Sequence, residues 1–157
     1  MANPVEWLFA KPPRRNVVKP QVIGRVRTDW LESHNHRDMQ LVEDFSYYDR
    51  FGWHWIAPAG SIINGANIPW FFRRLIGCPF VGPWRRPSVI HDVYCQEEIR
   101  PWPDVHRVFR EMCIMDGVWK PKAWVMWAGV RWFGPGSLFS RVYKGAARIM
   151  KSTKRSA

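Results

Sequence analysis

The sequence predicts an α+β fold in which an N-terminal antiparallel β-meander or set of hairpins precedes four to five α-helices. Two observations favour this fold class. Residues 20–63 combine strand-like alternation with turn signals, and from Pro69 onward the apolar residues recur at helical spacing. The chain has 157 residues, of which 46% are hydrophobic and 24% are charged, so it is long enough to bury a single core.

Three runs of residues are predicted to form the β region. In the third run, Trp53, Trp55 and Ala57 alternate with other residues, so they should share one face of a sheet. The turn DRFG suits a hairpin between the second and third runs, and the polar stretch HNHRD (34–38) is predicted to be a loop. The runs are QVIGRVRTDW (21–30), MQLVEDFSYY (39–48) and GWHWIAPAG (52–60).

The helical region follows a segment that contains two glycines and two prolines, APAGSIINGANIPW (57–70), which is predicted to be a shaped turn. The predicted helices share apolar stripes at helical spacing and end near glycine or proline. The helix that ends at Gly134 is apolar nearly all round, so it should be either covered or in contact with a partner. The helical segments are 69–77, 88–98, 103–117, 121–134 and a last helix capped by Ser137.

This interpretation divides the chain into three parts. Residues 1–19 contain prolines and the pair Arg14–Arg15 with little periodicity, which predicts an extended arm. Residues 20–135 should form a single α+β domain, and residues 136–157 a basic amphipathic helix with its tail. No internal repeat or low-complexity tract suggests a further division.

The positive charge of the chain is concentrated near its C-terminus. The net charge is +11, and residues 117–157 contain nine of the 24 Lys and Arg residues but none of the 13 Asp and Glu residues. Such a segment is typical either of a solvated helix face or of a surface that binds DNA, an anionic membrane or another polyanion. The candidate binding residues are Arg141, Lys144, Arg148, Lys151, Lys154 and Arg155.

A histidine and an aspartate stand side by side in an apolar helical run, SVIHDVYCQEE (88–98). Adjacent residues of a helix point about 100° apart, so the two side chains should not pair with each other. In a catalytic interpretation, His91 is a general base or ligand and Asp92 a metal ligand. In the alternative, both are structural and hold a loop against the helices, since a buried charge needs a partner.

His106 lies on the next predicted helix, and antiparallel packing could bring it within reach of His91. With Asp92, and with Asn64 delivered by the preceding turn, the two histidines form a candidate site for zinc or another divalent metal. The alternative is that His106 is an ordinary boundary residue and that no cofactor is bound. Cys95, one turn after His91, could form a nucleophilic pair with it, although a small buried cysteine is the commoner case.

The three cysteines are odd in number and widely spaced, which predicts reduced thiols in a cytoplasm. The only apolar stretch near the N-terminus is four residues long and stops at Lys11, so we expect no signal peptide. The apolar segment AWVMWAGV falls below the roughly 20 residues of a spanning helix, so we also expect no transmembrane segment.

Several stretches resemble, in order and spacing, a phage- and prophage-associated domain of unknown function. That domain has a strand ending in Val-Pro-Ala-Gly, then Asp-Gly-Ala-Ser-Ile-Pro, a helix with His-Asp-x-x-Tyr, a helix with Asp-x-x-Phe, and a closing Gly-Val. The matching stretches are APAG (57–60), NGANIP (64–69), HDVYC (91–95), HRVF (106–109) and DGV (116–118).

The chain departs from this family pattern at Asn64, Asn67, Cys95 and His106, where the family has Asp, Ser, Tyr and Asp. If the family site is a carboxylate cluster, two of its acids are missing here. The His-Asp pair is also similar to that of secreted phospholipases A2, but their glycine-rich calcium loop and disulfide set are absent.

The resemblance implies a phage gene product. The missing acids, the basic C-terminal segment and the abundance of tryptophan favour a virion or tail-associated structural protein over an enzyme. The resemblance implies other phage structural proteins as partners, and a location in the host cytoplasm during assembly and then in the virion. The first alternative is a small hydrolase, possibly metal-assisted, that acts in phage lysis or cell entry. The second is a binder of nucleic acid or anionic membranes through the C-terminal helix.

Overall fold

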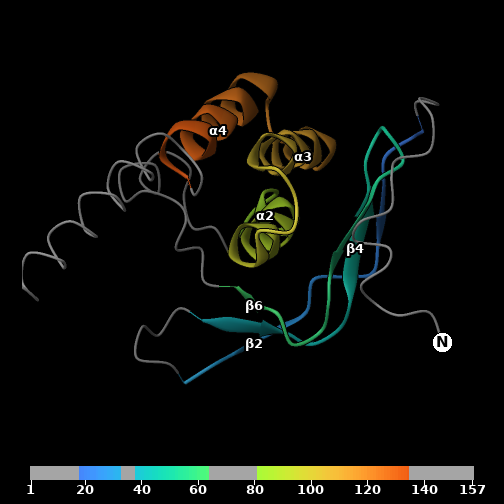
Figure 1. Ribbon diagram of the computed structural model, residues 1–157, viewed down its shortest axis with the longest axis vertical. Coiled ribbons are helices and arrows are strands. Elements are labelled where there is room, and N and C mark those ends of the chain that lie inside the picture. The colour runs from blue at the N-terminus through green and yellow to red at the C-terminus, as the bar shows by residue number, and fades with distance from the viewer. Residues whose placement is uncertain (1–17, 33–37, 64–80, 135–157) are drawn as a thin grey trace, which may run out of the picture.

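The structure is a computed structural model, and it describes residues 18–32, 38–63 and 81–134. Two small antiparallel sheets lie on one side of the helices, and Figure 1 shows α2 and α3 against them with α4 on the far side of α3. The strands are β1 (Gln21–Ile23), β2 (Thr28–Trp30), β3 (Met39–Leu41), β4 (Phe45–Tyr48), β5 (His54–Ala57) and β6 (Ile62–Ile63). The helices are α2 (Arg85–Glu97), α3 (Trp102–Met115) and α4 (Lys120–Phe133).

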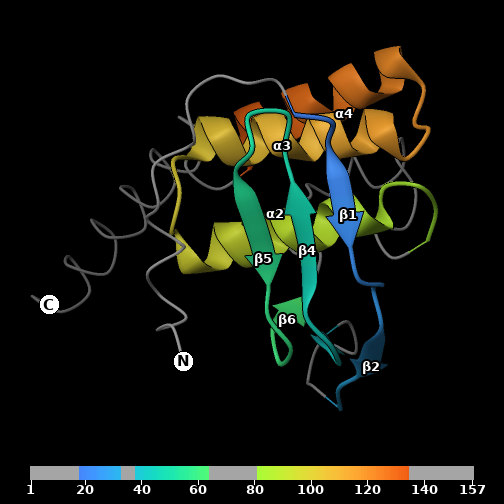
Figure 2. The ribbon, with the colours of Figure 1, turned by 90° about the vertical axis from the view of Figure 1, so that its right-hand side faces the viewer.

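The two sheets are the two halves of one bent antiparallel meander. In one sheet the order is β1-β4-β5, and in the other it is β2-β3-β6. Gln21 of β1 lies opposite Tyr48 of β4. Thr28 of β2 is seven residues after Gln21, and its partner in β3, Leu41, is seven residues before Tyr48, so the two strand pairs share one register. β4 and β5 likewise share a register with β3 and β6. Figure 2 shows the upper half in front of α2 and the lower half continuing beyond it.

The bend lies where the first predicted run contains a glycine. Gly24 has a φ of 85°, which side-chain-bearing residues rarely adopt, and a Cβ there would lie 2.9 Å from the carbonyl oxygen of Asp44. On the other side of the bend, the amide of Ala59 donates to Asp44 Oδ1 at 2.7 Å. The first two predicted runs are therefore each interrupted near the middle, and their two parts enter different sheets, whereas the third run contains β5 and ends before β6.

The hairpin turn between β4 and β5 is organised by Asp49, as the DRFG stretch predicted for that position. Asp49 Oδ1 accepts hydrogen bonds from the amides of Phe51 and Trp53, both at 2.9 Å. The Asp49 amide donates to the Trp53 carbonyl, and Gly52 adopts a φ of 77°. β5 then keeps the predicted alternation, because Trp55 and Ala57 are buried whereas His54 and Ile56 are partly exposed.

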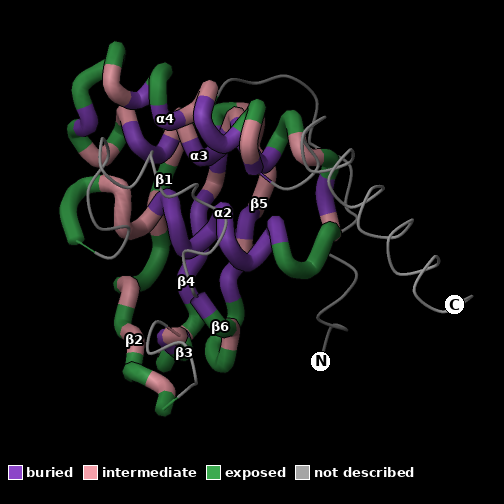
Figure 3. The backbone as a smooth tube through the Cα atoms, turned by 90° about the vertical axis from the view of Figure 1, so that its left-hand side faces the viewer, coloured by how far each residue is buried: buried purple, intermediate pink, exposed green. Residues whose placement is uncertain are grey.

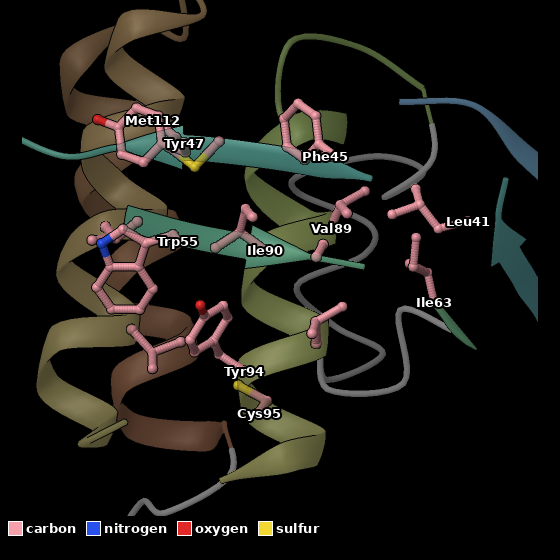
Figure 4. Packing of buried hydrophobic residues seen from close by; sticks show 14 residues of the cluster. Leu41, Phe45, Tyr47, Trp55, Ile63, Val89, Ile90, Tyr94, Cys95 and Met112 are labelled. Atoms are coloured by element: carbon pink, nitrogen blue, oxygen red, sulfur yellow. The ribbon is translucent and has the colours of Figure 1, made fainter. Parts of the chain in front are cut away.

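The main core lies between the sheet formed by β1, β4 and β5 and helix α2. Every residue from Pro87 to Cys95 is buried, so α2 is covered on all sides rather than on one apolar face. Figure 4 shows the side chains of Tyr47 and Trp55 from the strands gathered with Ile90 and Tyr94 of α2. The Tyr94 hydroxyl also accepts a hydrogen bond from the Ile56 amide at 3.0 Å, which ties α2 to the edge of β5.

A smaller second core joins α3 to α4. It contains Phe109 and Cys113 from α3 and Ala123, Met126 and Val130 from α4. The apolar stripe predicted for α3 is confirmed, since its four predicted members, Val105, Val108, Phe109 and Met112, are all buried. Among the described residues, α4 packs against α3 by one face and exposes the other.

The predicted α+β class with antiparallel strands before helices is confirmed. The number of helices is corrected, because the described residues contain three helices and not four to five. Two predicted helical segments, 69–77 and the one starting at Ser137, lie outside the described residues, as do residues 1–17 of the predicted arm. The predicted turn 57–70 contains the short strand β6 in its described part. None of the described helices is long and apolar enough to cross a bilayer.

Candidate functional site

Helix α2 places His91 and Cys95 on the same side, because residues four apart in an α-helix lie one turn above each other. The Cys95 sulfur lies 3.5 Å from His91 Nε2 and 3.7 Å from His91 Nδ1. The His91 ring contacts Phe109 of α3, whereas Cys95 belongs to the main core formed with β5. α2 is thus the element that brings an imidazole and a thiol together.

Helix α3 supplies a third group, His106. Its ring stacks on that of His91 with centroids 5.4 Å apart and an interplanar angle of 27°. One ligand atom each from His91, Cys95 and His106 can be chosen such that all three lie within 4.8 Å of one another. We call these three residues the His-Cys-His cluster. Phe109 packs against the His91 ring at 5.1 Å, so the cluster has apolar surroundings on the α3 side.

His106 has unusual surroundings for a polar residue. It is 1% exposed, and neither of its ring nitrogens has a hydrogen-bond partner in the structure. Burial, reinforced by the neighbouring His91 and Arg131, lowers the pKa of His106 to about 3. His106 is therefore a neutral imidazole at physiological pH, and a neutral imidazole is the form that ligates metals.

Cys95 is not prepared for nucleophilic catalysis. Burial raises the pKa of its thiol well above the usual range, and the nearby Asp92 carboxylate raises it further. A catalytic cysteine needs the opposite shift, since the thiolate is the reacting form. The Cys95–His91 pair that the sequence suggested is thus present as a contact, but it is not an activated pair in this protein.

Asp92 is not one of the three groups that converge in the His-Cys-His cluster, although it follows His91 in the chain. The closest approach of Asp92 Oδ1 to His91 Nδ1 is 3.9 Å, which is too long for a hydrogen bond, in agreement with the angular separation expected on a helix. Both residues are 2% exposed. Asp92 is therefore a buried carboxylate beside the cluster and not one of the three converging groups.

The structure brings together His91 and His106, two of the four residues predicted to bind a metal. Cys95 joins them in place of Asp92, and Asn64 lies outside the described residues. Also outside the described residues are the candidate polyanion-binding residues Arg141, Lys144, Arg148, Lys151, Lys154 and Arg155. The spacing of His91 and Cys95 was the signal in the sequence for the third ligand.

Comparison with known proteins gives a family whose function is not established. The family model described as a protein of unknown function, DUF1353, matches residues 39–130. The chain belongs to the DUF1353 family. The match includes all three residues of the His-Cys-His cluster and most of the strands and helices, but it begins after β2. No solved structure matches this DUF1353 protein.

Two curated relatives come from Sinorhizobium fredii (strain NBRC 101917 / NGR234). The uncharacterized protein y4iH is 37% identical over 95 residues, which are 60% of this chain and 40% of the relative. The uncharacterized protein y4jT is 42% identical over 98 residues, which are 61% of this chain and 29% of the relative. The matched region thus spans less than half the length of either relative.

A separate cavity of this DUF1353 protein lies between β5, the segment that joins α2 to α3, and the beginning of α3. Its volume is about 190 Å³, and its lining includes Arg100, Arg107 and Trp53 but no member of the His-Cys-His cluster. The guanidinium group of Arg100 stacks over the rings of Trp53 and Trp55 at 4.3 and 4.4 Å and donates to the His54 carbonyl. Arg100 therefore closes the end of the core as a packed cation.

A buried ionic network that the sequence did not predict holds the β4–β5 turn against α3. Asp49 Oδ2 accepts from Arg107 at 2.7 Å and from the Trp55 indole at 3.2 Å. Glu111 accepts from the Tyr47 hydroxyl at 2.7 Å and from the Arg50 amide at 2.8 Å. The spacing of Arg107 and Glu111 on one helix face was the available signal.

The outer face of α4 carries large aromatic side chains. Trp119 and Trp132 are 74% and 67% exposed, and Trp124 and Val125 are also exposed. Lys120 and Arg131 are exposed on the same helix, which contains no acidic residue. We call these six residues the α4 surface; the exposed parts of α4 can be followed in Figure 3.

Proposed function

We propose that this DUF1353 protein is a phage structural or tail-associated interaction protein that docks on its partner through the α4 surface. The observation that carries this proposal is the exposure of Trp124 and Trp132 on α4 and of Trp119 at its N-cap. Exposed tryptophans in a group favour binding, since Trp is enriched at the energetic centres of protein interfaces and costly to leave in water.

The charge of the same surface indicates the chemistry of the partner. Lys120 and Arg131 flank the tryptophans, and no acid occurs within residues 117–157. A partner with an apolar patch rimmed by Asp and Glu would therefore be steered to this surface and held there by burial of the indoles. Another phage structural protein with such a patch is the partner that we propose.

The buried position of the His-Asp pair supports a structural rather than a catalytic role for it. His91 and Asp92 are each 2% exposed, so a substrate could reach His91 only after the surrounding elements had moved. The raised pKa of Cys95 gives no activated thiolate. These features favour a fold-stabilising role, with function located on the surface.

The test asks whether the chain is incorporated into phage particles when it is produced in cells that release them. A tagged full-length chain should co-purify with particles on a density gradient. The double variant Trp119→Ser/Trp132→Ser should fold normally by circular dichroism and be lost from the particles. Trp30→Ser is the matched control, because Trp30 is 66% exposed on β2, far from α4, and its loss should leave particle association unchanged.

Absence of the wild-type chain from the particles would contradict the proposal, and so would full retention of the double variant. If the chain is absent from the particles but binds DNA or anionic vesicles in a salt-sensitive manner, the result would favour a function in polyanion binding. Salt sensitivity is the relevant signature because binding to a polyanion releases counterions.

A second candidate function is a small metal-assisted hydrolase, which the convergence of His91, Cys95 and His106 favours. A metal held by these residues could activate water. This candidate requires substrate access to the cluster. The metal-loaded wild-type chain should then hydrolyse a peptidoglycan or lipid substrate, and His91→Ala should abolish this hydrolysis. Absence of any turnover by the metal-loaded wild type would exclude the hydrolase function.

A further inference from the structure

The His-Cys-His cluster has the features of a set of metal ligands. Three potential donor atoms from two helices lie within 4.8 Å of one another, and all three side chains are buried. His106 is the most informative member, because both of its nitrogens are buried without a hydrogen-bond partner. An unsatisfied buried polar group costs about 1–3 kcal/mol, so proteins rarely retain one without a reason.

We infer that His91, Cys95 and His106 bind a zinc ion that fastens α2 to α3. This inference does not rest on the proposed docking function, since it concerns the interior of the fold. Zinc suits one thiolate and two imidazoles, and it takes such ligands in tetrahedral geometry. Water supplies the fourth position. The imidazole of His106 makes no hydrogen bond in the structure, and coordination to the ion gives one of its ring nitrogens a partner.

The distances fit a site that closes slightly on metal binding. Zinc bonds of about 2.0–2.3 Å place neighbouring ligand atoms about 3.3–3.6 Å apart in a tetrahedron. Cys95 Sγ and His91 Nε2 already lie 3.5 Å apart. The limit of 4.8 Å for the whole cluster means that His106 needs to approach by about 1 Å, which a small rotation of its side chain can supply.

Asp92 acquires a role as a positioning residue in this arrangement. If His91 binds zinc through Nε2, its Nδ1–H faces Asp92 Oδ1, now 3.9 Å away. A carboxylate in that place is the usual partner of a zinc-bound histidine, where it orients the ring and raises its basicity. The adjacent His and Asp of the sequence then act on one site, Asp92 through His91.

The first measurement is elemental analysis of the full-length wild-type chain purified from zinc-supplemented cells. We expect about one zinc per chain. After removal of zinc with a chelator, titration with Co²⁺ should produce the charge-transfer absorption of a cobalt–thiolate bond. Readdition of Zn²⁺ should abolish this absorption. It should also raise the melting temperature above that of the metal-free protein, since a ligand that binds only the folded state stabilises that state.

Three variants and one matched control assign the site. Cys95→Ser should abolish the cobalt–thiolate absorption, and His106→Gln should weaken zinc binding at least tenfold. Cys113→Ser is the control. Like Cys95, Cys113 is a buried cysteine, but it lies on α3 and belongs to the second core and not to the cluster. It should keep both the zinc and the absorption. Asp92→Asn should weaken zinc binding about 10–100-fold without a change in far-ultraviolet circular dichroism.

Zinc-free wild-type protein that also gives no cobalt–thiolate absorption would overturn the inference. An absorption that persists in Cys95→Ser, or disappears in Cys113→Ser, would overturn the assignment of the ligands. An unchanged zinc Kd in Asp92→Asn would overturn the role of Asp92. The wild-type measurements do not require any variant to fold, so a misfolded variant leaves the central test intact.

Discussion

Asp49 is the polar residue on which the described part of the fold depends most visibly. Its side chain is fully buried, and its two oxygens accept hydrogen bonds from two turn amides, the Trp55 indole and Arg107. Burial of a charge is favourable only when its lone pairs are satisfied to this degree. One carboxylate thereby fixes the hairpin turn and its attachment to α3.

Asp49→Asn should destabilise the protein by about 3 kcal/mol, because the amide cannot accept from all four donors and leaves Arg107 without its buried counterion. Urea unfolding followed by tryptophan fluorescence measures this loss. Asp104→Asn is the control, since Asp104 is half-exposed and lies 3.7 Å from the same Arg107. It should cost less than about 1 kcal/mol, and equal losses in both variants would contradict the special role of Asp49.

His54 should make the stability of the protein depend on pH. Burial, and secondarily the nearby Arg100, lower the pKa of His54 below its ordinary value of 6.5. As the pH falls, His54 is therefore protonated in the unfolded chain before it is protonated in the folded chain. The stability contributed by neutral His54 is full above pH 6.5 and decreases below that pH. Wild-type protein should lose more unfolding free energy between about pH 7 and about pH 5.5 than His54→Gln does. Parallel pH profiles would contradict this.

At the residue scale, the sequence allowed the meeting of His91 and His106 to be predicted, because two consecutive amphipathic helices usually pack antiparallel. It also placed Cys95 one turn from His91. It did not allow Asp49 to be identified as a buried counterion, since an acid before Gly52 is equally typical of a solvated turn. Its partner Arg107 is 58 residues away, and such non-local pairs leave no periodic trace in a single sequence.

At the scale of elements, the bent meander depends on backbone geometry at one glycine. Gly24→Ala should destabilise the protein by about 1–3 kcal/mol, because the new Cβ combines an unfavourable φ with a contact of 2.9 Å to the Asp44 carbonyl oxygen. Thermal unfolding measures the loss. Gly117→Ala is the matched control, with a φ of 89° but no atom within 4 Å of the new Cβ, so it should cost only the conformational part. A larger loss in Gly117→Ala would contradict this assignment.

The three β runs and the three described helices were predictable because their period-2 and period-3.6 patterns extend over many residues. The interruption of the first two runs was not predicted, although Gly24 within the first run was a signal for it. For α4, the sequence left two alternatives, full burial or contact with a partner. The structure places one face on α3 and leaves Trp119 and Trp132 exposed, which removes the first alternative.

At the scale of the whole molecule, the described fold needs strands that precede the region matched by the family model. β1 and β2 pair with β4 and β3, and Val22 packs against the main core. A fragment of residues 38–134 should therefore expose two unpaired strand edges and self-associate, whereas residues 18–134 should remain monomeric. Size-exclusion chromatography distinguishes them. A monomeric fragment of unchanged melting temperature would show that β1 and β2 are dispensable.

The order of the layers was harder to predict than the elements. Which helix lies between the sheet and the others depends on tertiary packing, and the apolar face of α2 alone would equally fit a surface helix. Its buried Ser88, His91 and Asp92 were the indication in the sequence, since polar residues within an apolar run suggest a helix enclosed on more than one side.

The enclosure of α2 has a consequence for how the protein opens. Since every residue from Pro87 to Cys95 is buried beneath both the strands and α3, no local fluctuation of the surface can release the amides of this helix to solvent. Their exchange with deuterium should therefore require disruption of the entire core and should proceed at the rate of global unfolding, while α4, attached by a single face, exchanges through smaller excursions.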